Sequence, residues 1–450
     1  MHAQRGGSLT VAIVGSGPAA MYAADELLTQ QGVRVNVFEK LPTPYGLVRA
    51  GVAPDHQTTK RVTALFDKIA ARPGFTFYLN VDVGSDLTHD ELLAHHHAVI
   101  YAVGAPTDRR LEVDGIELPG TGTATEFVAW YNGHPDFTDL PVDLSGERVV
   151  IIGNGNVALD VARILTTDPD VLARTDIADQ ALDALRTSRV QEVVIAARRG
   201  PAASAFTLPE LIGLTAACEV VLDPTDHQRV LADLAEETDA LTRNKLEILS
   251  KLGDASTPIT RPRIRLAYGL TPARILGDTT AAGVEFTVTG TEDRVQMSSG
   301  LVLTSIGYRG KPIRGLPFDD AAAVVPNEGG RVADTPGSYV AGWIKRGPTG
   351  FIGTNKSCAA ETVHNLVADY NNGLLTEPRH KSSALERFVR GRQPAVIDAA
   401  GWKAIDDAEV ARGGGLRPRD KFTSVTEMCA AAATAPAPPL HQRLLAGLRR

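Results

Sequence analysis

Two glycine-rich turns, each between an apolar strand and a helical pattern, constrain the fold of this 450-residue chain more than any other feature. The apolar runs are residues 9–14 and 148–152. The small residues that follow them are Gly15, Gly17 and Ala20 in the first turn and Gly153, Gly155 and Ala158 in the second. A strand, a tight turn and a helix N-terminus in this order form the phosphate-binding part of a dinucleotide fold. We therefore expect two Rossmann-like, doubly wound α/β domains.

Each small residue of such a turn has a physical role. The first glycine lets the chain turn sharply, the second lets phosphate approach the backbone, and the third small residue brings helix and strand together. The free N–H groups at the helix N-terminus then stabilise the anion. A single motif is weak evidence, whereas two motifs in the right context are strong evidence.

The residue that ends the next strand indicates which dinucleotide each turn binds. Glu39 ends the strand at residues 33–38 and would accept hydrogen bonds from ribose hydroxyls while repelling a phosphate, which suits FAD or NAD. An exposed strand-end glutamate is the alternative. Arg198 and Arg199 occupy the equivalent place in the second unit. Their guanidinium groups match a 2′-phosphate, which favours NADP over NAD. The alternative is that the two arginines form structural ion pairs within the protein. A flavin site and an NADP site in one chain indicate hydride transfer between nicotinamide and flavin.

Composition excludes several other classes. The formal net charge of −7 argues against a dedicated nucleic-acid binder. No apolar stretch is long enough to cross a membrane or to resemble a signal peptide, so we expect a cytoplasmic protein. The cysteines Cys218, Cys358 and Cys429 are far apart, so we expect no metal site, iron–sulfur cluster or redox disulfide. Any redox chemistry must then come from an organic cofactor.

Two further segments resemble a known family. Residues 41–56, Leu-Pro-Thr-Pro-Tyr-Gly-Leu-Val-Arg-Ala-Gly-Val-Ala-Pro-Asp-His, and residues 342–355, Gly-Trp-Ile-Lys-Arg-Gly-Pro-Thr-Gly-Phe-Ile-Gly-Thr-Asn, are similar to motifs of the adrenodoxin-reductase family of ferredoxin–NADP reductases. The resemblance runs in the same motif order from about residue 11 to residue 370. It implies an FAD domain at 1–107 and 308–450, the latter with a basic C-terminal extension, and an NADP domain inserted at 108–307.

The resemblance also implies residue roles. The positions expected along FAD are Ala19, Glu39, Leu47 and Val83, and those expected at the isoalloxazine are Trp343, Gly350, Phe351 and Ile352. The positions expected at NADP are Arg109, Asn154, Gly155, Asn156, Val157, Arg198, Arg199 and Glu210, with Gly350 touching both cofactors. Gly213 stands where relatives can carry an acidic residue, so no carboxylate role transfers to that position.

Hydride transfer needs proximity and orientation more than a protein acid or base, so we expect no catalytic triad. His56 and Asp160 are candidates for positioning the ring or relaying a proton, with a surface capping pair as an equally weighted alternative. Gly350 and Gly353 would let the backbone approach the flavin, unless they are ordinary turn glycines.

The resemblance also implies that electrons leave the chain singly and that their acceptor is an acidic ferredoxin. Basic residues of the helix-rich region 207–253 are docking candidates, unless they only face solvent: Arg229, Arg243, Lys245 and Lys251. Residues 379–450 carry 13 Lys/Arg against 7 Asp/Glu. This basic excess either docks an acidic partner or neutralises the acidic charge of residues 1–378. The alternative function is an NADPH-dependent flavin oxidoreductase or monooxygenase that acts on a small molecule.

Three smaller expectations concern local structure. Adjacent His95, His96 and His97 point in different directions from a helix end, which favours a solvated helix terminus over a metal site. Residues 339–343 read as a buried strand, and residues 430–439 as a loose linker rich in alanine and proline.

Overall fold

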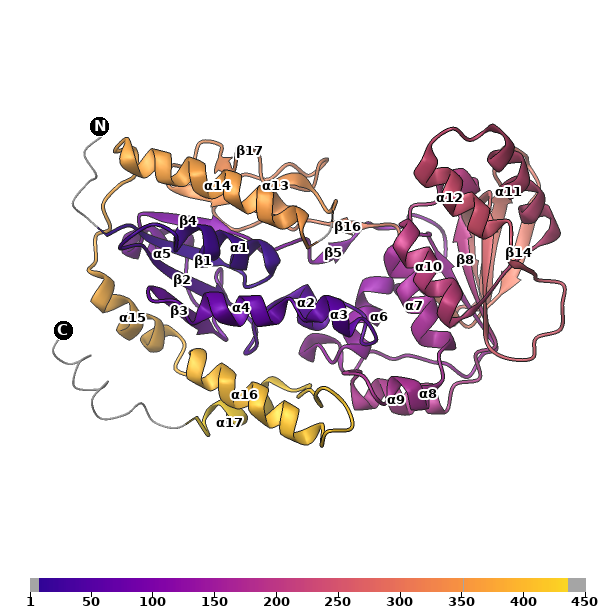
Figure 1. The fold of residues 1–450 in the computed structure, drawn as a ribbon, viewed down its shortest axis with the longest axis horizontal. Helices are drawn as coiled ribbons and strands as arrows, with labels where there is room; N and C mark the ends of the chain where they lie inside the picture. Colours follow the sequence, from indigo (N-terminus) through magenta and orange to yellow (C-terminus); the bar gives the residue numbers. More distant parts are fainter. Residues whose placement is uncertain (1–7, 351, 436–450) are drawn as a thin grey trace.

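The computed structural model describes residues 8–350 and 352–435, which form two lobes joined along one side (Figure 1). Each lobe is built on a seven-stranded sheet with helices packed on its faces. The first lobe contains strands from both ends of the chain, and the second contains the middle. This is the predicted α/β architecture, in which one dinucleotide-binding fold is inserted into another.

The sheet of the first lobe has the order β17-β18-β19-β4-β1-β2-β3. Its strands are β1 (Thr10–Val14), β2 (Arg34–Glu39), β3 (Phe75–Leu79), β4 (Ala98–Tyr101), β17 (Asn327–Glu328), β18 (Arg331–Val332) and β19 (Ser338–Val340). The five strands from β19 to β3 are parallel, and β1 is buried along its whole length. Burial on both faces explains its continuous apolar sequence.

Helices cover both faces of this sheet. They are α1 (Pro18–Leu27), α2 (Leu47–Ala50), α3 (Gln57–Lys60), α4 (Thr63–Ala70), α5 (His89–His95), α13 (Trp343–Arg346), α14 (Thr354–Asn371), α15 (Leu385–Arg392), α16 (Ala399–Arg412) and α17 (Val425–Ala432). Apolar side chains of α1, α4, α14 and α16 form one core with β1 and β2. The C-terminal helices α16 and α17 lie beneath α2 and α4 in Figure 1.

The sheet of the second lobe has the order β10-β9-β11-β8-β7-β15-β6. Its strands are β6 (Thr121–Thr123), β7 (Arg148–Ile152), β8 (Glu192–Ala197), β9 (Glu219–Leu222), β10 (Gly253–Asp254), β11 (Arg263–Tyr268) and β15 (Leu301–Thr304). All neighbouring strands in it are parallel. A separate antiparallel sheet is made by β12 (Leu270–Leu276), β13 (Gly283–Val288) and β14 (Arg294–Ser298).

The helices of the second lobe surround its larger sheet. They are α6 (Ala124–Tyr131), α7 (Asn156–Thr166), α8 (Pro169–Leu172), α9 (Asp179–Arg186), α10 (Leu208–Ala217), α11 (Pro224–Glu236) and α12 (Ala240–Leu249). The region 207–253 is helix-rich as predicted, but it also contributes β9 and β10 to the sheet. Short 3-10 turns lie at Pro135–Phe137, Pro201–Ala203 and Ser382–Ala384.

The chain passes between the lobes twice, at β5 (Thr107–Asp108) and β16 (Tyr308–Arg309). These two short strands pair with each other in antiparallel orientation. The boundaries 107/108 and 307/308 lie at this crossing, and we propose them as the limits of the inserted domain.

Two local predictions are wrong. The strand expected at 339–343 ends at Val340, and Trp343 instead begins α13, because Gly342 adopts φ +78 and turns the chain out of the sheet. Residues 430–432 belong to α17 rather than to a linker. The basic end at 436–450 lies outside the described residues. In the part of the chain described here, no helix has the length and apolar character of a membrane span.

Candidate functional site

The two glycine turns have the same local design. Gly15 and Gly153 adopt φ +96 and +114, and a Cβ atom on either would lie within 2.6 Å of a backbone oxygen of the neighbouring strand segment. By contrast, a Cβ atom on Gly17 or Gly155 would meet nothing within 4 Å. The first glycine of each turn therefore permits the bend, and the second leaves open space in front of the helix N-terminus.

Both helices that follow these turns begin without a side-chain cap. Gly17 is the N-cap of α1 and Gly155 the N-cap of α7, so no side-chain oxygen accepts from the first N–H groups of either helix. Uncapped N–H groups next to open space are suited to a pyrophosphate. The residues present at both turns thus fit a dinucleotide. Ala19 and Ala20 lie in the first turn of α1, and Ala20 is fully buried against the sheet.

Glu39 closes the first turn from the side. Its carboxylate accepts hydrogen bonds from Ser16 N at 3.1 Å, Ser16 Oγ at 2.7 Å and Leu41 N at 3.1 Å. Burial raises the pKa of Glu39, and these hydrogen bonds act in the opposite direction. The residue is half-buried and held in place, which differs from the alternative of a freely exposed strand-end side chain.

Arg198 and Arg199 leave β8 at the carboxyl end of the second sheet, and both are exposed. Among the described residues, neither guanidinium group forms an ion pair. The alternative role of the two arginines, a structural ion pair, therefore finds no acidic partner in this part of the chain. Their backbone oxygens are held, because Arg198 O accepts from Thr289 Oγ1 at 2.9 Å and Arg199 O accepts from Gly269 N at 3.4 Å. The pair thus has a fixed backbone and free cationic ends.

Asn154 and Asn156 connect the second turn to the segment before α10. Asn156 Oδ1 accepts from Thr207 N at 2.8 Å, and Asn154 Oδ1 accepts from Ala205 N at 3.4 Å. Both asparagines therefore support the loop that leads to Glu210. Val157 lies in the first turn of α7 and packs toward the core of the second lobe.

Three titratable side chains from separate elements meet at the junction of the lobes. His56 Nε2 lies 4.0 Å from Asp160 Oδ1 and 3.9 Å from Glu210 Oε2. His56 precedes α3, Asp160 lies on α7 and Glu210 lies in the first turn of α10. The two groups of the predicted His56–Asp160 pair are therefore close, although the separation exceeds a hydrogen bond.

Arg163, which was not among the residues expected from the sequence, organises this cluster. It donates to Asp160 at 2.7 Å and to both oxygens of Asp55 at 2.5 and 3.0 Å. Burial raises the pKa of Asp160, while Arg163 and His56 lower it. The i, i+3 spacing of Asp160 and Arg163 on one helix could have predicted their ion pair. The contact with Asp55 could not be predicted in this way, because Asp55 belongs to the other lobe.

Trp343 carries the clearest sign of a missing partner. Its Nε1 atom is buried and makes no hydrogen bond within the described residues. A buried indole N–H normally has an acceptor, so this atom suits a bound polar group such as a flavin. Tyr308, which the sequence analysis did not single out, packs on Trp343 with 5.1 Å between ring centroids. The signal for Tyr308 in the sequence was an aromatic residue directly after Gly307, beyond the carboxyl end of β15.

The remaining predicted positions are dispersed around the carboxyl ends of the sheets. Gly350 is exposed at φ +80, and Ile352 packs on the core of the first lobe. Leu47 is 42% exposed on α2, and Val83 is half-buried beyond β3. Arg109 is exposed at the crossing, where its N–H donates to Gly307 O at 2.9 Å. Phe351 lies outside the described residues.

The histidine run is not a solvated helix terminus, so that prediction is wrong. His95, His96 and His97 are 5%, 1% and 6% exposed. His96 Nε2 accepts from Asn36 Nδ2 at 2.9 Å, and its Nδ1 donates to Leu92 O at 2.8 Å. His95 stacks on Phe388, because the C-terminal part of the chain covers the end of α5.

Three of the four docking candidates are engaged within their own lobe. Arg229 donates to Tyr268 O at 2.7 Å, Arg243 to Glu237 O at 3.1 Å and Lys245 to Ser204 O at 3.0 Å. Lys251 is exposed, and its side chain has no polar contact among the described residues.

Comparison with known proteins identifies the relatives of this chain. The family model for pyridine nucleotide-disulphide oxidoreductases matches residues 9–197. A probable ferredoxin/ferredoxin–NADP reductase of Mycobacterium tuberculosis is 71% identical over 98% of this chain and 78% of its own length. The mitochondrial NADPH:adrenodoxin oxidoreductase of Homo sapiens is 40% identical over 93% of this chain and 91% of its own length.

A solved structure agrees with these sequence relatives. Mycobacterium tuberculosis FprA in complex with NADPH superposes with a TM-score of 0.89 at 41% identity, over 95% of this chain and all of that one. All three cysteines of the present chain are free, so no disulfide accompanies the shared fold. The chain therefore belongs to the adrenodoxin-reductase family of ferredoxin–NADP reductases, and it is an oxidoreductase that uses FAD and NADP.

Proposed function

We propose that this chain transfers hydride from NADPH to FAD and passes the electrons singly to a ferredoxin. The observation that carries the proposal is the pair of open, uncapped glycine turns, one in each lobe, with the Trp343 N–H and the His56 cluster near the lobe junction. Bound FAD would supply the capacity to accept a hydride and to release electrons one at a time.

In the second lobe, Arg198 and Arg199 would bind the 2′-phosphate of NADPH through charge-assisted hydrogen bonds. The turn at Gly153–Asn156 and the N-terminus of α7 would hold the pyrophosphate. Glu210, Arg109 and Val157 are the remaining proposed contacts to NADPH. Arg198, Arg199 and the second glycine turn all lie in the second lobe, so the adenosine end would be held by that lobe.

In the first lobe, the turn at Gly15–Gly17 and α1 would hold the pyrophosphate of FAD, and Glu39 would accept from its ribose. Trp343 would donate its unpaired N–H toward the bound cofactor. Gly350 would let the backbone approach the isoalloxazine, because it has no Cβ. The further proposed FAD contacts are Ala19, Ala20, Leu47, Val83, Phe351 and Ile352.

His56 and Asp160 would orient the reacting rings and hold a proton near them. Replacing His56 with glutamine keeps a polar side chain but removes the titratable group. We expect slower flavin reduction by NADPH and a changed pH profile for that step. A wild-type rate at every pH would leave the pair with a structural role only.

The proposed electron acceptor is an acidic ferredoxin, which would complement basic side chains such as Lys251. The sharpest test of the function uses the visible spectrum of the purified protein before and after NADPH, repeated with NADH. We expect a bound flavin that NADPH bleaches much faster than NADH does. Adding a ferredoxin and cytochrome c should then accelerate NADPH oxidation.

Two results would contradict the proposal. A flavin that NADPH does not reduce would remove the reductase activity. Equally fast NADPH oxidation with oxygen alone, or with a small substrate and no ferredoxin, would favour the small-molecule flavin enzyme.

A further inference from the structure

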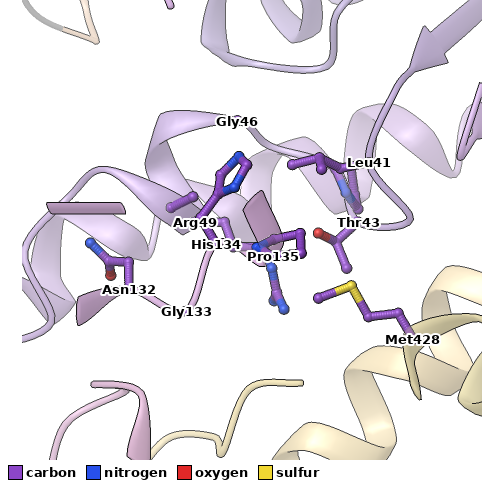
Figure 2. A pocket seen from close by; sticks show the side chains of 11 residues that line it. Leu41, Thr43, Gly46, Arg49, Asn132, Gly133, His134, Pro135 and Met428 are labelled. Carbon is purple, nitrogen blue, oxygen red and sulfur yellow. The ribbon is translucent and has the colours of Figure 1, made fainter. Parts of the chain in front are cut away.

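The C-terminal segment, residues 398–435, has no role in the function proposed above, yet it lies against both lobes. Its helices α16 and α17 follow the first lobe, and the loop between them reaches α9 of the second (Figure 1). At this seam a small pocket is lined by Thr43 and Arg49 of the first lobe, Asn132 and His134 of the second, and Met428 of the segment (Figure 2). The segment is therefore a third component of the lobe interface.

Asp176 is the polar centre of this interface. It lies between α8 and α9 in the second lobe and is 4% exposed. Lys60 Nζ donates to both of its oxygens at 2.8 Å, and Gln57 Nε2 donates at 2.9 Å, both from the first lobe. Lys421 of the C-terminal segment forms an ion pair with it at 3.2 Å. One buried carboxylate thus joins all three parts.

Lys421 makes further contacts that define its position. It is 3% exposed, and its ammonium group donates to Asn132 O at 3.0 Å and Asn132 Oδ1 at 3.2 Å. Burial alone would raise the pKa of Asp176, but the ammonium groups of Lys421 and Lys60 lower it to about 2. The carboxylate stays ionised, and the contact keeps its geometry because a buried charge without its partner is costly.

The C-terminal segment is itself fixed to the first lobe. Glu409 is fully buried and accepts from Arg49 at 2.5 and 2.9 Å and from Phe422 N at 3.0 Å. The ring of Trp402 packs edge-on against Tyr45 at 5.9 Å. Lys421 lies next to Phe422, and its ammonium group donates to Arg49 O at 3.4 Å, so it contacts the first lobe as well as Asp176.

We propose that Lys421 and Asp176 are positioning residues that set the orientation of the NADP lobe against the FAD lobe during hydride transfer. The inference rests on the proposed function, because the groups assigned to NADPH and those assigned to the flavin lie almost entirely in different lobes. The two reacting ends meet correctly only if the lobe interface is fixed. A misplacement of about 1 Å can slow such a step about 100-fold.

The test replaces Lys421 with methionine, which has a similar length and no charge. We expect the rate of flavin reduction at saturating NADPH to fall at least about tenfold, by stopped-flow absorbance of the holoenzyme. The dissociation constant of 2′,5′-ADP should change less than about twofold, because the proposed 2′-phosphate site lies within the second lobe. Flavin content should also stay the same. This separation distinguishes positioning from loss of structure.

Arg419→Gln is the matched control. Arg419 is half-buried and donates to Asp406 at 2.5 Å and to Glu409 at 3.3 Å, and both of these residues belong to the C-terminal segment. We expect this variant to transfer hydride at nearly the wild-type rate. Asp176→Asn removes the same contact from the other side and should reproduce the rate loss. The double variant with Lys421→Met should be no slower than the slower single variant.

The proposal is overturned if Lys421→Met reduces its flavin at the wild-type rate. It is also overturned if the affinity for 2′,5′-ADP or the flavin content of Lys421→Met falls by the same factor as its rate of flavin reduction. A rate of flavin reduction in Arg419→Gln as low as that of Lys421→Met would overturn it too. Should Lys421→Met not fold, a wild-type rate in Asp176→Asn overturns it equally. Failure of the wild-type flavin to respond to NADPH would instead reject the proposed function, so the two failures are distinct.

Discussion

Tyr308 packs against Trp343 with 5.1 Å between the ring centroids and 35° between the ring planes. Tyr308 belongs to β16, where the chain returns from the second lobe, and Trp343 begins α13 in the first. Burial raises the pKa of Tyr308 to about 12, so its hydroxyl is neutral. The contact connects the crossing between the lobes to the indole whose N–H has no partner among the described residues.

This contact predicts different outcomes for two substitutions. Tyr308→Phe keeps the ring and should leave flavin reduction by NADPH within about twofold of wild type. Tyr308→Ala removes an aromatic pair worth about 1 kcal/mol beyond its buried area, and we expect a rate about fivefold lower. Stopped-flow reduction of the holoenzyme measures both. Equal rates in the two variants would show that the ring does not position Trp343.

The two arginines after β8 should determine coenzyme preference. Replacing either Arg198 or Arg199 with alanine removes a charge-assisted contact worth about 1.5–3 kcal/mol. We expect KM for NADPH to rise about 10- to 100-fold per substitution, while KM for NADH stays unchanged, because NADH lacks the 2′-phosphate. Steady-state kinetics with both coenzymes provides the measurement. A parallel loss with NADH would place the arginines at another part of the coenzyme.

The second glycine turn offers a matched pair of substitutions. A Cβ on Gly153 would lie 2.2 Å from Ser305 O at φ +114, so Gly153→Ala should destabilise the fold by about 2 kcal/mol or more. A Cβ on Gly155 would meet no protein atom within 4 Å, so Gly155→Ala should keep the wild-type Tm. It should nevertheless weaken NADP binding about tenfold or more by filling the space for phosphate. Undiminished NADP affinity in a stable Gly155→Ala variant would argue against the cradle.

His96 predicts a pH dependence of stability. Burial lowers its pKa from 6.5 to about 4. Between these values the unfolded chain binds a proton that the folded chain does not, so the free energy of unfolding falls as pH drops from 6.5 to 4. The contribution of His96 is about 3 kcal/mol at most. Urea unfolding at several pH values should show a shallower dependence for His96→Gln, and an unchanged slope would exclude this origin.

Much of the site could be predicted because it is local in sequence. Each strand, turn and helix N-terminus lies within about 20 residues, and the residue after the next strand faces the same edge of a parallel sheet. Gly15, Gly17 and Glu39 therefore had to lie together once β1 and β2 paired. The same local logic placed Arg198 and Arg199 at the carboxyl end of β8.

Two other predictions were wrong, one because a distant segment covers the residues and one because a glycine turns the chain. The His95 run reads as a polar helix end, yet residues 380–388 cover it, almost 300 positions later in the chain. Trp343 reads as the end of a strand, but the left-handed Gly342 starts a helix there. The segment that covers His95 is not visible in the local pattern, whereas Gly342 is adjacent to Trp343 and only its positive φ is absent from the sequence.

Short-range backbone geometry and side-chain chemistry were enough to predict the two dinucleotide folds and the residues of each glycine turn. By contrast, the contacts of His56 with Asp160 and Glu210, of Tyr308 with Trp343, and of Lys421 with Asp176 depend on how distant parts of the chain pack. These contacts join residues up to about 245 positions apart. The contacts of His56 and Lys421 form only when the two lobes pack together, and no local preference specifies that packing.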